Sequence, residues 1–292
     1  MAHERVSAPL HVTFCPSTVV GYSIATREPS LPGRSLRTEP RIEAEVGRYR
    51  LRLAECGEDC EAACRLRFKV FNIEMNEGWQ SSYKTGLDTD KYDAVCEHLL
   101  VEDKRDRRVV GTYRMQSGAT AAANFGYYSE QEFQLSAYEP LRSQILELGR
   151  ATIDREHRTP EVVTLLWRGI AQFASNQNLR YLLGCSSMNS QNPAEGWQMY
   201  RELERYRVSP EFATEPTPVY ACPSVCEYAA VLHPTAEVNV PKLLRSYLAI
   251  GCRIGGPPAW DREFGTIDFL TFLDLELVTP SVRKRFLAPL TR

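Results

Sequence analysis

Long apolar runs are missing from this sequence of 292 residues: no stretch approaches the roughly eighteen or more apolar residues that a membrane span requires. A strong excess of one charge is missing as well, because 37 acidic residues face 35 basic ones. The charge balance therefore gives no indication that nucleic acid is a partner. Residues 1–30 carry prolines and charges instead of a basic start followed by an apolar segment, so we expect a cytoplasmic protein.

Disulfides are not expected either, since the nine cysteines are an odd number in a chain long enough to bury a core without them. Cys56, Cys60 and Cys64 are spaced four apart, as are Cys222 and Cys226, which would place each set on one face of a helix. Structural zinc sites favour tighter C-x2-C pairs. We therefore predict small, reduced core residues and no metal site.

The chain divides by composition into three parts. Residues 1–46 are rich in Pro, Ser, Thr and Arg without any sustained period, which predicts a mobile N-terminal arm. Residues 47–206 alternate strand and helix patterns and form the predicted core. Residues 207–292 begin with several prolines and continue with a strand-like "EYAAVLH", a helix from Pro241 and an apolar strand "IDFLTFLDL". We expect this C-terminal extension to pack on the same core.

The order of the predicted elements indicates the fold class. Alternating apolar residues predict strands, and apolar residues at helical spacing predict helices. The predicted core elements are a strand in "RYRLRLAEC", a helix over 58–75, a hairpin over 96–116, strands in "SQILELGRATID" and "RYLLGCS", and helices over 159–176 and 193–205. Thr159 is the expected N-cap of the helix over 159–176, with Pro160 at its first position. This order predicts an α/β protein with a mixed sheet.

Charged residues stand beside apolar ones in four stretches: "LRFKVF", "DKYD", "GTYR" and "ELGR". Burial of an unpaired charge costs several kcal/mol, so these groups should pair with one another. The arginines are Arg67, Arg114 and Arg150, and the carboxylates are Asp90, Asp93 and Glu147. A structural salt-bridge network and a functional site both remain open at this point.

The same residues carry a family resemblance. Arg67 with Phe71, Asp90 with Asp93, Arg114 after Gly111, and Glu147 with Arg150 resemble acyl-homoserine-lactone synthases, a branch of the GNAT acyltransferases. "HLLVED", "VVGTYRM", "ELGRATID", "LLWRGIAQF", "LGCSSMNSQNP" and the stretch from "PKLLRSYLAIGC" to "IDFLTFLDL" resemble more closely the N-acyltransferases that make lyso-ornithine lipid and related N-acyl amino acids. This resemblance covers residues 48–275 approximately, almost the whole chain beyond the arm.

The resemblance implies a GNAT fold, with a mixed, mainly antiparallel central sheet flanked by helices. It implies transfer of a long acyl chain, with or without a 3-hydroxyl group, from acyl carrier protein to the amine of an amino acid such as ornithine or glycine. No bound cofactor or metal is implied. A lactone-type signal synthase that uses S-adenosylmethionine, and a non-catalytic module that holds a carrier protein or a lipid, are the alternatives.

The resemblance also implies roles for individual residues. Glu147 is the candidate base that takes a proton from the incoming amine, and Arg150 acts beside it or holds it in place. Tyr200 falls where many GNAT enzymes carry a tyrosine that protonates the leaving thiolate, although an aromatic side chain that only fills space is the alternative. The candidate substrate-binding residues are Arg67, Phe71, Trp79, Asp90, Asp93 and Arg114.

The expected donor site lacks glycine. Acetyl-CoA-dependent relatives carry an R/Q-x-x-G-x-G/A turn, whereas the corresponding segment here is "DREHRTPEV". Arg155, His157, Arg158 and Thr159 at a helix N-terminus could hold one phosphate, which is what the phosphopantetheine of acyl carrier protein offers. Acyl carrier protein is therefore favoured over coenzyme A, and a solvated basic loop is the alternative.

The helix "KLLRSYLAI" bears on location, because Leu244, Tyr247 and Leu248 share one side and Lys242 and Arg245 lie nearby. Such a helix either rests on an anionic membrane surface or faces its own core. A peripheral contact with the inner membrane thus stays open beside a purely cytoplasmic location.

Overall fold

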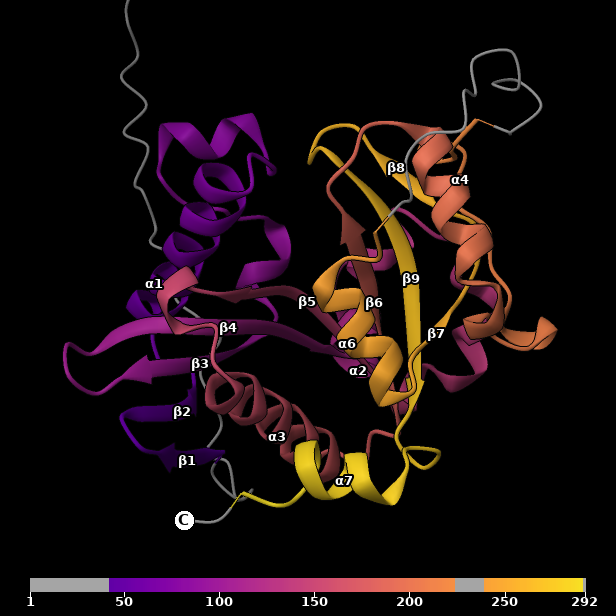
Figure 1. Ribbon diagram of the computed structural model, residues 1–292. Helices are drawn as coiled ribbons and strands as arrows, with labels where there is room; N and C mark the ends of the chain where they lie inside the picture. The colour runs from indigo at the N-terminus through magenta and orange to yellow at the C-terminus, as the bar shows by residue number, and fades with distance from the viewer. Residues whose placement is uncertain (1–41, 224–238, 291–292) are drawn as a thin grey trace, which may run out of the picture. The chain divides into compact units, whose positions relative to one another are not determined.

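A single twisted sheet organises the protein. The computed structural model describes residues 42–223 and 239–290, and over these ranges nine strands form one sheet in the order β1-β2-β3-β4-β5-β6-β9-β7, with β8 also pairing with β9 (Figure 1). The strands are β1 (Glu43–Val46), β2 (Tyr49–Leu53), β3 (Glu97–Asp103), β4 (Arg108–Ser117), β5 (Ile145–Ile153), β6 (Tyr181–Met188), β7 (Arg253–Ile254), β8 (Ala259–Asp261) and β9 (Thr266–Asp274). All pairs are antiparallel except β5 with β6.

Helices cover both faces of this sheet. They are α1 (Gly57–Phe68), α2 (Gly118–Ala123), α3 (Pro160–Asn176), α4 (Pro193–Glu202), α6 (Lys242–Ile250) and α7 (Pro280–Phe286). Because side chains alternate along a strand, Leu99 and Val101 of β3 pack with α3, whereas Leu100 packs with α1. Figure 1 shows α3 and α6 in front of the sheet. The mixed, mainly antiparallel sheet between helices is the GNAT-type fold that the sequence predicted.

Most predicted elements of the core are confirmed. The strand from Tyr49, the hairpin of β3 and β4, strands β5 and β6, and helices α3 and α4 lie where the patterns put them. Helix α3 has Thr159 as N-cap and Pro160 at its start, although the Thr159 side chain makes no capping hydrogen bond. The helix predicted over 58–75 ends as an α-helix at Phe68 and continues as a π-helical turn, Lys69–Glu74. Strand β1 was missed: it lies within the stretch assigned to the arm.

The residues after 206 contribute to the same sheet. Strand β9 pairs with β6 along its whole length, from Tyr181 opposite Asp274 to Met188 opposite Ile267. The predicted strand "EYAAVLH" falls on residues outside the described ranges. Helix α6 begins after Pro241, and its Leu244 and Leu248 are buried in a cluster with α4 and β9, so this apolar side faces the core.

No helix in the described ranges combines the length and apolar character needed to cross a membrane.

Candidate active site

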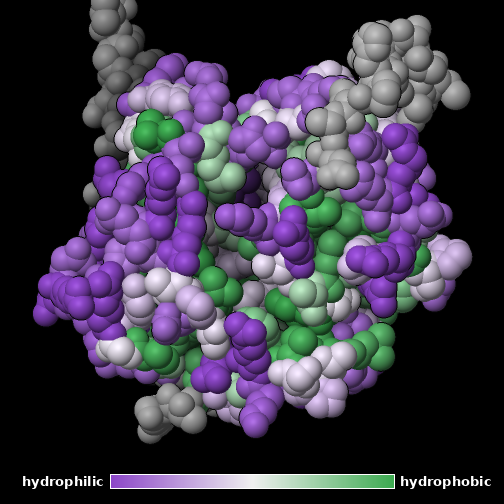
Figure 2. All heavy atoms as spheres, in the orientation of Figure 1, coloured by the Kyte–Doolittle hydropathy of each residue, from purple (hydrophilic) through white to green (hydrophobic). Residues whose placement is uncertain are grey.

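A cavity of about 810 Å³ lies where the sheet divides. This volume falls within the roughly 300–1,000 Å³ of small-molecule sites. One part of its wall is apolar and comes from α3, α6 and β9, with Val163, Leu166, Trp167, Tyr247 and Leu273. The other part is polar and carries Ser129, Glu132, Glu147, Arg150, Asp261 and Asp268. Figure 2 shows the front face of the molecule hollowed near its centre, with hydrophilic residues around the opening.

Strands β5 and β6 create this space because they pair only where they begin. Their parallel register ends at Glu147 and Leu183, although β5 continues to Ile153 and β6 to Met188. Gly184 allows a last close approach, since a Cβ at this position would lie 2.2 Å from the carbonyl oxygen of Leu148. The cavity is lined by the last paired residues and by the diverging parts of both strands, residues 147–153 of β5 and 182–188 of β6.

A bulge in β5 turns the strand away from its neighbour. Gly149 pairs with Arg114 and Thr152 with Thr112, so Arg150 and Ala151 together oppose one residue of β4. Arg150 has φ 52°, in the left-handed region. Residues three apart on a regular strand would point to opposite faces. The bulge instead brings the Arg150 guanidinium over the ring of Tyr128, the residue whose amide binds Glu147.

Glu147 is held by the turn that precedes β5. Its Oε1 accepts hydrogen bonds from the amide and the hydroxyl of Ser129, both at 2.7 Å, and its Oε2 accepts one from the amide of Tyr128 at 2.9 Å. Burial raises the pKa of Glu147, and these hydrogen bonds and the charge of Arg114 offset part of the rise. Because a carboxylate can accept about four hydrogen bonds, one site on Oε2 is left for a proton or a water.

The buried arginines pair with aspartates and not with Glu147. Arg67 binds Asp88 at 2.8 Å and Asp93 at 2.7 Å. Arg114 binds Asp90 at 2.6 Å and Asp93 at 3.1 Å, while Arg150 reaches Asp88 and Asp90 at 3.4 and 3.3 Å. The expected matching of Glu147 with an arginine is therefore wrong, and Asp88 takes the place that we gave to Glu147.

Most of this arginine–aspartate network lies outside the cavity wall and has a structural role. Arg114 lines the cavity, whereas Arg67, Asp90 and Asp93 do not. Asp90 and Asp93 form a reciprocal capping box on the short helix Lys91–Ala94, so they fold the loop beside the site. Sequence reasoning missed Asp88. This residue lies two positions before Asp90 in the same acidic stretch, so the sequence offered it as a further candidate partner for the arginines.

Aromatic rings surround Arg150. Its guanidinium carbon lies 4.6 Å from the ring centre of Trp79 and 4.8 Å from those of Tyr128 and Phe264. Phe71 lines the cavity and contacts Phe264 edge to face, with ring centres 5.5 Å apart. Trp79 lies behind this layer and is not part of the cavity wall. Cation–π contacts of this kind hold the guanidinium in place, while its N–H groups face Asp88 and Asp90.

The expected donor-binding residues are separated by the structure. Arg158 lines the cavity and binds Glu74 at 2.7 and 2.9 Å. Arg155 is exposed, and the Thr159 side chain interacts with Glu161 in the first turn of α3. His157 is buried, with its Nδ1 3.1 Å from the Tyr49 hydroxyl. Only Arg158 of these four thus reaches the cavity.

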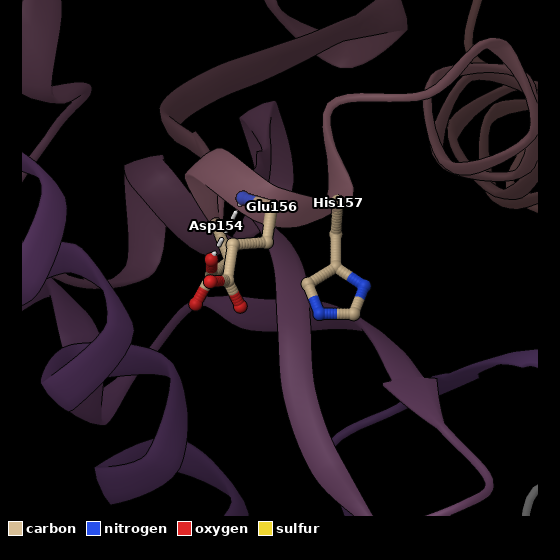
Figure 3. A group of neighbouring side chains, drawn as sticks. All are labelled: Asp154, Glu156 and His157. Atoms are coloured by element: carbon tan, nitrogen blue, oxygen red, sulfur yellow. Dashed lines mark hydrogen bonds between the residues drawn. The ribbon is translucent and has the colours of Figure 1, made fainter.

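His157 belongs to a group of side chains with the composition of a metal site (Figure 3). The picture shows the carboxylates of Asp154 and Glu156 next to each other and the imidazole to one side. Asp154 already binds Lys69 at 2.7 Å and the amide of Glu156 at 3.1 Å. Because protein groups already contact the ligand atoms of Asp154 and His157, these two side chains connect the end of β5 with its neighbours.

Tyr200 lies in α4 and is not among the residues that line the cavity. Its ring lies 6.0 Å from that of Trp197 and carries the Arg207 guanidinium at 4.1 Å. Burial raises the pKa of Tyr200. The structure therefore places this half-buried side chain beside Trp197 and Arg207, against the core cluster of α4 and α6, and outside the cavity wall.

A second set of carboxylates, which sequence reasoning missed, lies in the polar wall. Glu132, Asp261 and Asp268 are all buried and line the cavity, and each offers an oxygen within 4.8 Å of the other two. Asp261 and Asp268 come from β8 and β9, more than a hundred residues from Glu132, so no local pattern could have grouped them.

Several known proteins are similar to this chain. Residues 66–168 match the family model described as an acetyltransferase (GNAT) domain. Among solved structures, the acyl-homoserine-lactone synthase LasI is 12% identical with a TM-score of 0.45, over 84% of this chain and 97% of that one. FeeM, an N-acyl amino acid synthase from uncultured soil microbes, is 12% identical with a TM-score of 0.44, over 82% and 95%. The divided sheet and the domain match define the class of this protein, a GNAT-type acyltransferase.

Full-length relatives narrow the class. An L-ornithine N(alpha)-acyltransferase of Rhizobium meliloti (strain 1021) is 30% identical over 247 residues, which cover 80% of this chain and 82% of the relative. The enzyme of that name from Brucella abortus (strain 2308) is 29% identical over 248 residues, 82% of this chain and 88% of the relative. The chain belongs to the family of L-ornithine N(alpha)-acyltransferases.

Proposed function

We propose that this protein transfers a long acyl chain from acyl carrier protein to the α-amine of ornithine. The observation that carries the proposal is the cavity at the divided edges of β5 and β6, which joins an apolar wall to a polar wall that contains Glu147. Two substrates of opposite character, a fatty acyl thioester and a charged amino acid, fit such a space. The names of the relatives supply the acceptor and the nitrogen that is acylated.

The acyl chain would occupy the apolar part. Val163, Leu166 and Trp167 of α3 and Tyr247 of α6 offer a wall that favours methylene groups over water. The hydroxyls of Tyr113 and Tyr247 bind each other at 2.5 Å, so the polar atoms within this part are satisfied. A 3-hydroxyl group near the thioester would need a partner at the polar end of the cavity.

The donor arm would enter near Arg158, because this residue combines exposure with a place in the cavity wall. Its charge could bind the phosphate of phosphopantetheine. A glycine turn that would close on the pyrophosphate of coenzyme A is absent from "DREHRTPEV". This supports acyl carrier protein as the donor.

The chemistry follows from the position of Glu147 at the last paired residue of β5. The acceptor ammonium gives one proton to Oε2 of Glu147, directly or through water, and the free amine attacks the thioester carbonyl. A backbone N–H of β5 near the bulge would stabilise the oxyanion. The C–N bond forms and the C–S bond breaks as the intermediate collapses. The nitrogen loses its second proton, the thiolate takes up one proton, and one is released to solvent.

The test is acylation by the purified protein, with acyl carrier protein thioester or acyl-CoA as donor and ornithine as acceptor, followed by mass spectrometry of the product. We expect Nα-acylornithine, formed faster from the carrier-protein thioester. Absence of any acylated amine with either donor would refute the proposal. A lactone product that requires S-adenosylmethionine would instead identify a signal synthase.

Two variants separate a catalytic from a structural role of Glu147. Glu147→Gln removes the proton acceptor, and we expect kcat to fall by about 10²–10⁴. Ser129→Ala removes one hydrogen bond to the same carboxylate but keeps the carboxylate itself. We expect the second variant to lose far less activity. Equal losses in two variants of equal thermal stability would mean that Glu147 only holds the turn.

A further inference from the structure

The three carboxylates of Glu132, Asp261 and Asp268, called the acidic triad below, lack a cation. Their relative exposures are 1%, 4% and 3%. No ion pair joins any of them to a basic residue within 42–223 and 239–290, and the nearby Arg150 pairs with Asp88 and Asp90 instead. Buried carboxylates are normally paired or bind a cation, because each unpaired charge is costly in a dry environment. The triad therefore calls for a positively charged ligand.

Unused oxygen atoms point to the same conclusion. Oε2 of Glu132 and Oδ1 of Asp268 are fully buried, and neither has a hydrogen-bond partner in the described part of the chain. The other contacts come from polar groups of the protein without a full charge: Asp261 Oδ1 accepts from the amides of Glu263 and Phe264, Asp268 from the Thr266 and Ser187 hydroxyls, and Glu132 from the Cys185 thiol. Two acceptors in a cavity wall thus remain for a donor that comes from outside the protein.

The electrostatics of the triad agree with this geometry. Burial and the repulsion of Asp268 and Asp261 raise the pKa of Glu132 well above its ordinary value. Burial raises the pKa of Asp268 to about 6, with Asp261 adding to the rise, whereas the Ser187 and Thr266 hydroxyls and the charge of Arg150 lower it. A bound cation would restore the charged form of these groups.

The triad is connected to Glu147 through one turn and one strand. Ser129 donates to Glu147, and the amide of Glu132 binds the carbonyl of Ser129 at 3.2 Å. On β6, Leu183 pairs with Glu147, and Cys185 two residues later contacts the Ser129 hydroxyl at 3.5 Å. The rise of a strand makes this step about 7 Å along β6. The methylene chain of a diamino acid bridges a comparable distance.

We propose that the acidic triad binds the side-chain ammonium of a diamino acid acceptor and thereby directs acylation to the α-amine. This inference rests on the proposed function. An ammonium offers three donors, which match the two unused oxygens and the Asp261 carboxylate. Bound in this way, the side-chain nitrogen keeps its protons and is not a nucleophile, while the α-amine lies at Glu147. Arg150, in the same polar part of the cavity wall, would bind the acceptor carboxylate.

The test compares two acceptors in Asp268→Asn and Glu132→Gln. Ornithine carries the side-chain amine, and norvaline has the same carbon chain without it. Both substitutions keep an oxygen acceptor and remove one negative charge. We expect KM for ornithine to rise about tenfold or more, since a charge-assisted hydrogen bond is lost. The ratio of kcat/KM for ornithine to kcat/KM for norvaline should therefore fall about tenfold or more. Circular dichroism of each variant checks that it is folded.

The matched control is Glu263→Gln, which removes an exposed acidic charge two residues from Asp261. It should leave the preference for ornithine over norvaline as it is. Fragmentation of the ornithine product adds a second readout, because the triad variants should form Nδ-acylornithine beside the Nα product.

Each other outcome contradicts the inference in a distinct way. Equal losses of kcat with both acceptors would assign the triad to the chemical step. Unchanged KM values would show that no ammonium binds there. A requirement of the wild-type protein for an added divalent cation after chelator treatment would assign the triad to a metal. Failure of the wild-type protein to acylate either amino acid would count against the proposed function itself.

Discussion

Replacement of Arg67 by methionine should remove a large part of the protein's free energy of unfolding. Arg67 is fully buried and donates to both carboxylates of its partners, with Nε bound to Asp88 at 2.8 Å and Nη1 and Nη2 bound to Asp93 at 2.8 and 2.7 Å. Another bond joins Nη2 to the carbonyl of Asp88. Methionine fills a similar space, but it gives neither aspartate the positive charge and the hydrogen bonds that Arg67 supplies.

The magnitude follows from the burial of the whole group. Removal of one partner of a buried ion pair costs about 3–5 kcal/mol. The free energy of unfolding of a domain is about 5–15 kcal/mol. For a domain of this size, each kcal/mol shifts Tm by roughly 2–4 °C, so we expect a fall of roughly 6–20 °C.

Arg65→Met is the matched control, because Arg65 lies on the same helix and its ion pair with Glu61 is exposed, at 62% and 52% of the side chains. Exposed pairs contribute at most about 1 kcal/mol. Urea denaturation of both variants, followed by circular dichroism, measures the difference. If Arg67→Met costs no more than Arg65→Met, the reasoning about the buried network is refuted.

The difference in stability between the wild type and Arg67→Met should depend on pH, and the direction of this dependence can be predicted. Burial alone would raise the pKa of Asp93, but the charge and hydrogen bonds of Arg67, with the charges of Arg114 and His98, hold it well below its usual range. A carboxyl with a lowered pKa stabilises the fold above its unfolded pKa of about 3.9 and loses this contribution as the pH falls further. The gap between wild type and Arg67→Met should therefore narrow below about pH 4.

Two further predictions concern the cavity. Val163→Trp adds volume to the apolar wall of the cavity. Mass spectrometry of the products formed from a mixture of acyl donors should therefore show a shift toward shorter acyl chains. An unchanged distribution of chain lengths would place the acyl chain elsewhere. Tyr200→Phe should change kcat by less than about twofold, because the hydroxyl lies outside the cavity wall, whereas a loss near the 10²–10⁴ of general acid catalysis would put this hydroxyl at the leaving thiolate.

Local pattern was enough for most of the fold. The hairpin of β3 and β4, the apolar strands β5 and β6, and the start of α3 at Thr159 and Pro160 each carry their signal within a few neighbouring residues. Strands β7 and β8 were missed, because two or three residues are too short for a period to appear. They exist only because β9 offers an edge to pair with.

The site was predicted less completely. The sequence indicated that Arg67, Arg114 and Arg150 must find carboxylates, but it could not indicate which ones. Pairing depends on the bulge that turns Arg150 toward Asp90, and a bulge arises from register between strands and not from composition. Glu147 instead binds the backbone amides of Tyr128 and Ser129, and a backbone donor leaves no mark in the side-chain pattern of the sequence.

The sequence by itself thus determined the fold class, the order of the main elements and the presence of buried charge on a core strand, because periodicity and the cost of unpaired charge act on each segment alone. Only the tertiary structure decided where β5 and β6 part, which carboxylate faces which cation, and that Glu132, Asp261 and Asp268 meet in one wall. These features depend on contacts between segments far apart in the chain, where the position of one strand sets the surroundings of another.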